Sequence, residues 1–153
     1  MKDIKSIKYV FNLNDILRIL PHRFPFLLID QILKFKKNLY ICALKNITAN
    51  DFFFFFGHFP KKYIFPGILI VESIAQSSGF LLSYSKKSTT INSKICGLTG
   101  IYDTSFINPV YPGDQMIIKS YFKKELSGIY IFSGIVMVKK NIVCKSTISL
   151  AFL

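Results

Sequence analysis

One short segment carries the side chains that could do chemistry. Between Gly57 and Gln76, the sequence has one of only two histidines, His58, and one carboxylate, Glu72, within a heavily apolar chain. A neutral imidazole can accept a proton near neutral pH, because unperturbed histidine titrates near about 6.5. Apolar surroundings favour the protonated form of a carboxyl group, which would make Glu72 a candidate general acid. The two residue types together are typical of acid–base catalysis.

The backbone around these residues has signals of a preorganised site. His58 lies in the Gly-His-Phe-Pro stretch 57–60, a constrained turn that can hold an imidazole toward a pocket. A Pro-Gly pair ending at Gly67 then opens a helix, whose first N–H groups lack intrahelical acceptors and could stabilise a carbonyl oxygen that gains negative charge. Gln76 shares a helical face with Glu72 and could orient it by a hydrogen bond.

A structural interpretation of both residues stays open at this point. A lone histidine in a turn is more often structural than catalytic. A lone glutamate in an apolar helix could be the buried partner of Arg23 or of a lysine. Residue types and spacing alone therefore do not decide between a catalytic site and a structural one.

The elements that hold this segment follow from the spacing of apolar residues. Asn14 is a suitable N-cap for a short helix, DILRIL, that Pro21 ends. Residues 67 to about 84 predict one long helix that is apolar on most of its faces. The remaining apolar runs alternate as strands do: FLLIDQILKF, LYICALKNI, KICGLTGIY, DQMIIKSYFKK, GIYIFSGIVMVKK and IVCKSTISLAFL.

An apolar helix in a strand-rich chain predicts an α+β fold in which a curved antiparallel sheet wraps the long helix. The 153 residues suit one domain, 1–153, because two domains would each be undersized. Hydrophobic residues make up 51% of the chain, which is ample for a core and argues against disorder. Long edge strands would need protection, and pairing with a second copy of the chain would provide it.

Charge and cysteine content narrow the partners and the compartment. The net charge of +12 predicts attraction to an acidic partner, such as nucleic acid, an anionic membrane or an acidic carrier protein. Cys42, Cys96 and Cys144 lie far apart without a CxxC pair, so neither a disulfide framework nor a zinc site is supported. The chain starts without an apolar signal-peptide core, and polar residues within 63–85 make a poor membrane helix. We expect a cytoplasmic protein without membrane insertion.

Four segments of the chain together resemble one known family. They are LPHRFPFLLID (20–30), GHFP (57–60), FPGILIVESIAQ (65–76) and NPVYPGDQ (108–115). Their order and approximate spacing resemble those of the FabZ-type (3R)-hydroxyacyl-[acyl carrier protein] dehydratases of bacterial fatty-acid synthesis. The resemblance extends from about Asn14 to Leu153, and four motifs in register are far more specific than GHFP alone.

The resemblance implies a hot-dog fold, with the long helix as the sausage and the sheet as the bun, in dimers that group into a trimer of dimers. The family's active-site histidine matches His58, and its glutamate matches Glu72, supplied by the opposite subunit. The N–H of Gly67 would hold the thioester carbonyl while a (3R)-3-hydroxyacyl group loses water and becomes a trans-2-enoyl group. The acyl chain would arrive on acyl carrier protein, and no metal or organic cofactor is implied.

The chain departs from the family pattern where a carrier protein would dock. Lys61-Lys62-Tyr63 replaces the usual Gly-Arg-Pro, and residues 105–108 lack the usual basic side chains. The candidate docking lysines are Lys61, Lys62, Lys86, Lys87 and Lys94. His22 and Arg23 belong to the first motif, and the prolines around them favour a role in shaping the chain rather than in catalysis.

Other functions stay open at the level of the sequence. The related dehydratase/isomerases resemble this chain at GHFP and at Pro-Gly but typically have Asp where Glu72 stands. A hot-dog thioesterase would not call for His58 in GHFP. A non-catalytic acyl-binding or nucleic-acid-binding module is suggested by the positive charge alone, without a recognition helix, RNA-binding motif or zinc finger.

Overall fold

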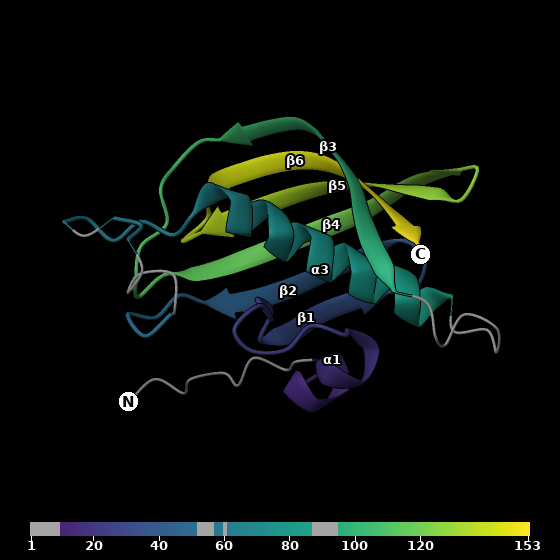
Figure 1. Ribbon diagram of the computed structural model, residues 1–153, viewed down its shortest axis with the longest axis horizontal. Coiled ribbons are helices and arrows are strands. Elements are labelled where there is room, and N and C mark those ends of the chain that lie inside the picture. The colour runs from purple at the N-terminus through teal and green to yellow at the C-terminus, as the bar shows by residue number, and fades with distance from the viewer. Residues whose placement is uncertain (1–9, 52–56, 60, 87–94) are drawn as a thin grey trace.

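A long helix, α3 (Gly67–Ser85), lies inside a curved six-stranded sheet in the computed structural model, which describes residues 10–51, 57–59, 61–86 and 95–153 (Figure 1). The strand order is β1-β2-β4-β5-β6-β3, and all neighbouring strands are antiparallel. The other elements are α1 (Leu13–Ile19), β1 (Gln31–Lys36), β2 (Tyr40–Asn46), β3 (Cys96–Phe106), β4 (Gln115–Leu126), β5 (Ile129–Val138) and β6 (Asn141–Phe152). The predicted α+β hot-dog architecture is confirmed.

The first helix begins two residues earlier than the sequence predicted. Its N-cap is Asn12 rather than Asn14, because Asn12 forms a reciprocal capping box with Asp15. The Asp15 N–H donates to the Asn12 side chain at 3.2 Å, and the Asn12 N–H donates to the Asp15 carboxylate at 3.0 Å. The predicted end before Pro21 is correct, since Leu20 is the C-cap.

Two strand boundaries also differ from the prediction. The run FLLIDQILKF forms a strand only from Gln31, because the N–H of Leu28 donates to the side chain of Gln76 on α3 instead of to a neighbouring strand. The run KICGLTGIY continues as β3 to Phe106, paired with β6 along its length. Both differences arise from contacts with residues far away in the sequence.

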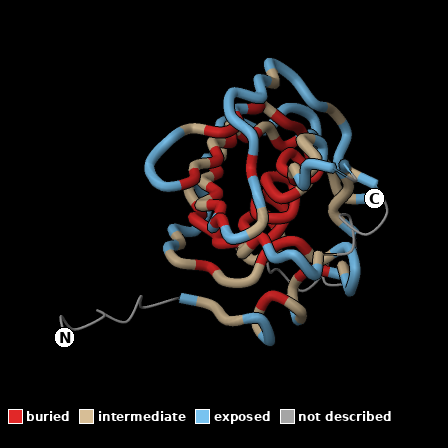
Figure 2. The backbone as a smooth tube through the Cα atoms, turned by 90° about the vertical axis from the view of Figure 1, so that its left-hand side faces the viewer, coloured by how far each residue is buried: buried red, intermediate tan, exposed pale blue. Residues whose placement is uncertain are grey.

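Helix α3 is buried on most of its faces, as predicted (Figure 2). Its three buried serines Ser73, Ser77 and Ser78 donate their hydroxyl groups to the carbonyls four residues earlier, at 2.7–2.8 Å. Polar side chains are therefore satisfied within the helix itself, and the core around it stays apolar. None of the helices in the described part of the chain has the length and apolar character that crossing a bilayer requires.

A glycine of β5, Gly134, lets the sheet approach α3 closely. A Cβ atom built at Gly134 would overlap the side chain of Ile74, which is fully buried on α3. The facing backbone must therefore carry no side chain at this position. Gly79, on α3 itself, has room, because its nearest neighbour to a built Cβ is a methyl group of Leu20 at 3.9 Å.

We predict opposite effects of the same substitution at these two glycines. Gly134→Ala forces Ile74 and β5 apart and should lower the free energy of unfolding by about 1–3 kcal/mol. Gly79→Ala should raise it by about 0.5–1 kcal/mol, because alanine favours a helix. Urea denaturation of both variants checks the prediction, and equal stability of the two would contradict the packing described here.

Candidate active site

His58 is held by a closed loop that fixes its tautomer. Its Nδ1 lies 2.7 Å from the carbonyl oxygen of Ile64, while the N–H of Ile64 donates back to the carbonyl of His58 at 3.4 Å. A carbonyl oxygen can only accept a hydrogen bond, so Nδ1 carries the proton of the neutral ring and Nε2 keeps a free lone pair. The ring stacks on Phe59 at 4.1 Å between centroids. His58 therefore presents a basic nitrogen in a fixed orientation.

His58 and Gly67 line the same cavity, of about 460 Å³. Gly67 is the first residue of α3, so its N–H has no acceptor within the helix. A Cβ at Gly67 would stand 3.0–3.3 Å from the ring of Phe106, so the aromatic ring leaves little room for any side chain there. The cavity is otherwise mainly apolar. The His58 side chain and the N-terminus of α3 thus line one mainly apolar cavity.

Glu72 faces a different cavity, of about 260 Å³, between α3, the segment after α1 and the start of β3. Its side chain is 18% exposed. Among the described residues, none lines both this cavity and that of His58. Within one chain, the two candidate catalytic groups are therefore not brought together.

Gln76 binds Glu72 and the segment before β1 at the same time. Its Oε1 accepts the N–H of Leu28 at 2.9 Å, and its Nε2 donates to the carbonyl of Phe26 at 2.7 Å and to Glu72 Oε1 at 2.9 Å. The hydrogen bond from Gln76 to Glu72 that the sequence predicted is present. Because Gln76 is only 2% exposed, these three bonds satisfy all of its polar atoms with little help from water.

The sequence did not predict the contact between His22 and Glu72. The His22 Nε2 lies 3.6 Å from Glu72 Oε1, so the neighbour of Glu72 is His22 rather than Arg23. Arg23 instead donates to the carbonyls of Leu17 and Leu20, where it binds the C-terminal end of α1. The only sequence signal for His22 was its place in the LPHRFPF motif, 50 positions before Glu72.

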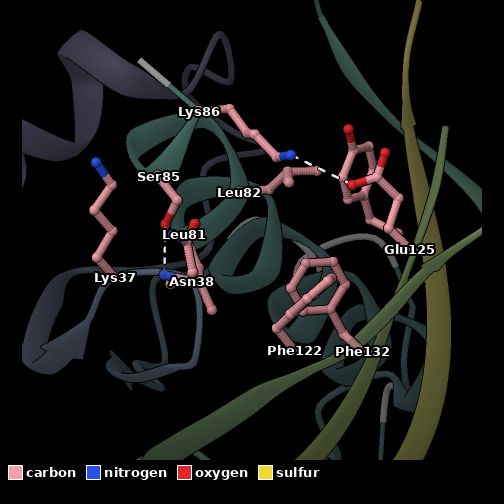
Figure 3. Close-up of a pocket in the computed structure, with 10 residues that line it drawn as sticks. Lys37, Asn38, Leu81, Leu82, Ser85, Lys86, Phe122, Glu125 and Phe132 are labelled. Atoms are coloured by element: carbon pink, nitrogen blue, oxygen red, sulfur yellow. Dashed lines mark hydrogen bonds and ion pairs between the residues drawn. The ribbon is translucent and has the colours of Figure 1, made fainter. Parts of the chain in front are cut away.

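The candidate docking lysines differ in their contacts with other residues. Lys61 and Lys62 are exposed, close to His58. Lys86 turns toward Glu125, 3.3 Å away, and lies 5.2 Å from the ring centre of Tyr130. It lines a third cavity, of about 270 Å³, at the C-terminal end of α3 (Figure 3). Lys87 and Lys94 lie outside the described residues.

Two of the three cysteines, Cys96 and Cys144, are not poised for nucleophilic chemistry. Burial raises the pKa of the Cys96 thiol to about 12 and that of Cys144 to about 11, so both stay protonated at neutral pH. A protonated thiol is a poor nucleophile, although Cys96 lines the Glu72 cavity. In the part of the chain that the structure describes, no three His, Cys, Asp or Glu side chains gather as ligands for a metal ion.

Comparison with known proteins identifies the family. The model of the FabA-like domain matches residues 20–147. The chain belongs to the FabA-like family.

Two curated relatives of this FabA-like chain are similar along almost their whole length. The 3-hydroxyacyl-[acyl-carrier-protein] dehydratase FabZ of Buchnera aphidicola subsp. Schizaphis graminum is 45% identical over 145 residues, 95% of this chain and 94% of the relative. The protein of the same name from Escherichia coli O9:H4 is 40% identical over 143 residues, 94% of this chain and 93% of the relative.

Solved structures with low identity share the fold of this FabA-like chain. The dehydratase heterocomplex ApeI:P from Xenorhabdus doucetiae aligns with a TM-score of 0.72 at 15% identity, over 90% of each chain. A hypothetical thioesterase with coenzyme A from Streptococcus pneumoniae aligns with a TM-score of 0.58 at 11% identity, over 80% of this chain and 84% of the other. The fold alone therefore does not separate dehydratases from thioesterases.

We predict that Gln76→Leu destabilises the protein by about 1–3 kcal/mol, because it leaves the buried N–H of Leu28 without an acceptor. The matched control is Gln115→Leu, which removes one exposed hydrogen bond to Asn46 and should change stability by less than about 0.5 kcal/mol. Chemical denaturation measures both variants. A Gln76 variant no less stable than the control would contradict the role given to this amide.

Proposed function

We propose that the protein is a 3-hydroxyacyl-[acyl-carrier-protein] dehydratase, a hydro-lyase that converts (3R)-3-hydroxyacyl-[acyl carrier protein] into the trans-2-enoyl thioester and water in type II fatty-acid synthesis. The observation that carries the proposal is the similarity to two FabZ dehydratases at 40–45% identity over more than nine-tenths of each chain. The free Nε2 of His58 beside the N-terminus of α3 supplies the chemistry that this reaction needs.

His58 and Gly67 act on the thioester end of the substrate in this proposal. The thioester acidifies the C2 proton, and His58 Nε2 removes it. The negative charge that develops on the thioester oxygen is stabilised by the N–H of Gly67, at the positive end of the helix dipole. The cavity lining is mainly apolar, and this interaction strengthens when the bound acyl chain displaces water from it.

Glu72 completes the reaction at C3. Its protonated carboxyl group gives a proton to the departing hydroxyl, which leaves as water, and the C2–C3 double bond forms from the electrons of the broken C2–H bond. The proton taken by His58 returns to Glu72 through solvent before the next turnover. Gln76 supports Glu72 through the 2.9 Å hydrogen bond to Oε1.

The active site assembles from two copies of the chain in this proposal. Two observations support a homodimer. His58 and Glu72 of one chain line separate cavities. Strand β3 lies at the edge of the sheet and exposes the apolar side chains Leu98, Ile101, Tyr102 and Phe106. A second copy that covers this edge would bring its own Glu72 toward His58, and a trimer of such dimers completes the proposed assembly.

The partner that delivers substrate is an acidic acyl carrier protein. The net charge of +12 favours such a partner, and Lys61 and Lys62 are exposed three and four residues after His58. Lys86 can contribute only by leaving Glu125, and Lys87 and Lys94 remain sequence-based candidates. The reaction as proposed needs no metal or organic cofactor, and it takes place in the cytoplasm on a single-domain chain.

We predict that the purified protein forms enoyl absorbance from a short (3R)-3-hydroxyacyl carrier substrate without releasing free carrier thiol. His58→Ala and Glu72→Gln should each lower kcat by about 10²–10⁴-fold, because each removes one proton-transfer group. Glu125→Gln, the same change at an exposed carboxylate, should keep kcat within about twofold. Thiol release without enoyl absorbance would instead indicate a thioesterase.

A further inference from the structure

His22 stands beside Glu72 in a segment that is fixed at both ends. Arg23 donates to the carbonyl of His22 at 2.7 Å and to the end of α1, and Gln76 binds Phe26 and the N–H of Leu28 on the other side. The imidazole is 25% exposed, and Phe26 stacks against it at 6.3 Å. The backbone around His22 is thus held independently of the contact with Glu72, so the ring has a defined position before substrate arrives.

The surroundings of the ring indicate which nitrogen carries the proton. Nδ1 of His22 is buried and has no hydrogen-bond partner among the described residues. A buried N–H without an acceptor is rarer in proteins than an acceptor without a donor. The neutral ring therefore places its proton on Nε2, the nitrogen that faces Glu72 Oε1 at 3.6 Å.

Gln76 also contacts Oε1 of Glu72, and its hydrogen bond indicates that this oxygen is an acceptor. The Gln76 Oε1 already accepts from Leu28, so the group that meets Glu72 is an N–H donor, at 2.9 Å from Oε1. Two N–H groups, from Gln76 and His22, thus point toward one oxygen of the carboxyl group. Oε1 is accordingly an acceptor, and the transferable proton resides on Oε2.

We propose that His22 is a positioning residue for Glu72, which directs Oε2 toward the substrate and stabilises the carboxylate that forms when the proton leaves. The inference rests on the proposed dehydratase function. The separation of 3.6 Å is longer than a hydrogen bond, and catalytic contacts of this kind commonly shorten only when substrate is bound. His22 touches no reacting atom, so its effect falls on kcat more than on KM.

The test compares two substitutions of His22 by an amide side chain, which differ only in the length of that side chain. In His22→Gln the amide nitrogen can take the place of Nε2, whereas in His22→Asn it stands near the place of Nδ1. With the carrier substrate, His22→Gln should keep kcat within about fivefold of the unmodified protein. His22→Asn should lose about 10-fold to 100-fold in kcat, the range expected for a lost hydrogen bond to a charged group, with KM changed less than threefold.

A second measurement tests whether the effect passes through Glu72. In a Glu72→Gln background, His22→Asn should lower kcat by less than about twofold, because two substitutions that act through the same group are not additive. Equal kcat losses in the Gln and Asn variants, or full additivity with Glu72→Gln, would overturn the inference. Failure of the unmodified protein to dehydrate the substrate would instead contradict the proposed function.

Discussion

The burial of α3 on most of its faces is the constraint on which the rest of the structure depends. A helix enclosed by a curved sheet can carry polar groups only where each one finds a partner, because an unsatisfied polar group costs about 1–3 kcal/mol in such a place. The serines of α3 satisfy this condition through the carbonyls of their own helix. Gln76 satisfies it through the segment before β1. Because α3 is buried on most of its faces, a reactive group on it can meet a substrate only where the helix lines a cavity.

The two candidate reactive groups on α3, the N–H of Gly67 and the carboxyl group of Glu72, face different cavities. The first residue of α3, Gly67, opens on the cavity of His58, and Glu72 opens on a second cavity five residues later. A carbonyl could be held at the first and a hydroxyl protonated at the second only if two chains combine their cavities. The exposed apolar edge of β3 would favour the pairing of two chains that the proposed site requires.

Much of the fold and the site could be predicted from local patterns. The long apolar helix, the alternating strands and the Gln76–Glu72 hydrogen bond follow from spacings of two to four residues. Four motifs pointed to His58, Glu72 and Gly67, whose catalytic roles stay predictions. What could not be predicted depends on contacts between distant residues. The first strand starts late because Gln76 binds Leu28, 48 positions away, and Lys86 at the end of α3 meets Glu125 of β4. The sequence favoured a structural role for His22, because no local pattern places it next to Glu72.

Subunit exchange between two inactive variants tests most directly whether two chains share one active site. If His58 of one chain works with Glu72 of another, exchange of subunits between His58→Ala and Glu72→Gln gives mixed dimers with one intact site and one doubly altered site. Random exchange at equal amounts should restore about one quarter of the activity of the unmodified protein, because half of the dimers are mixed and each has one of two sites intact. No recovery after mass spectrometry has verified subunit exchange would contradict the account.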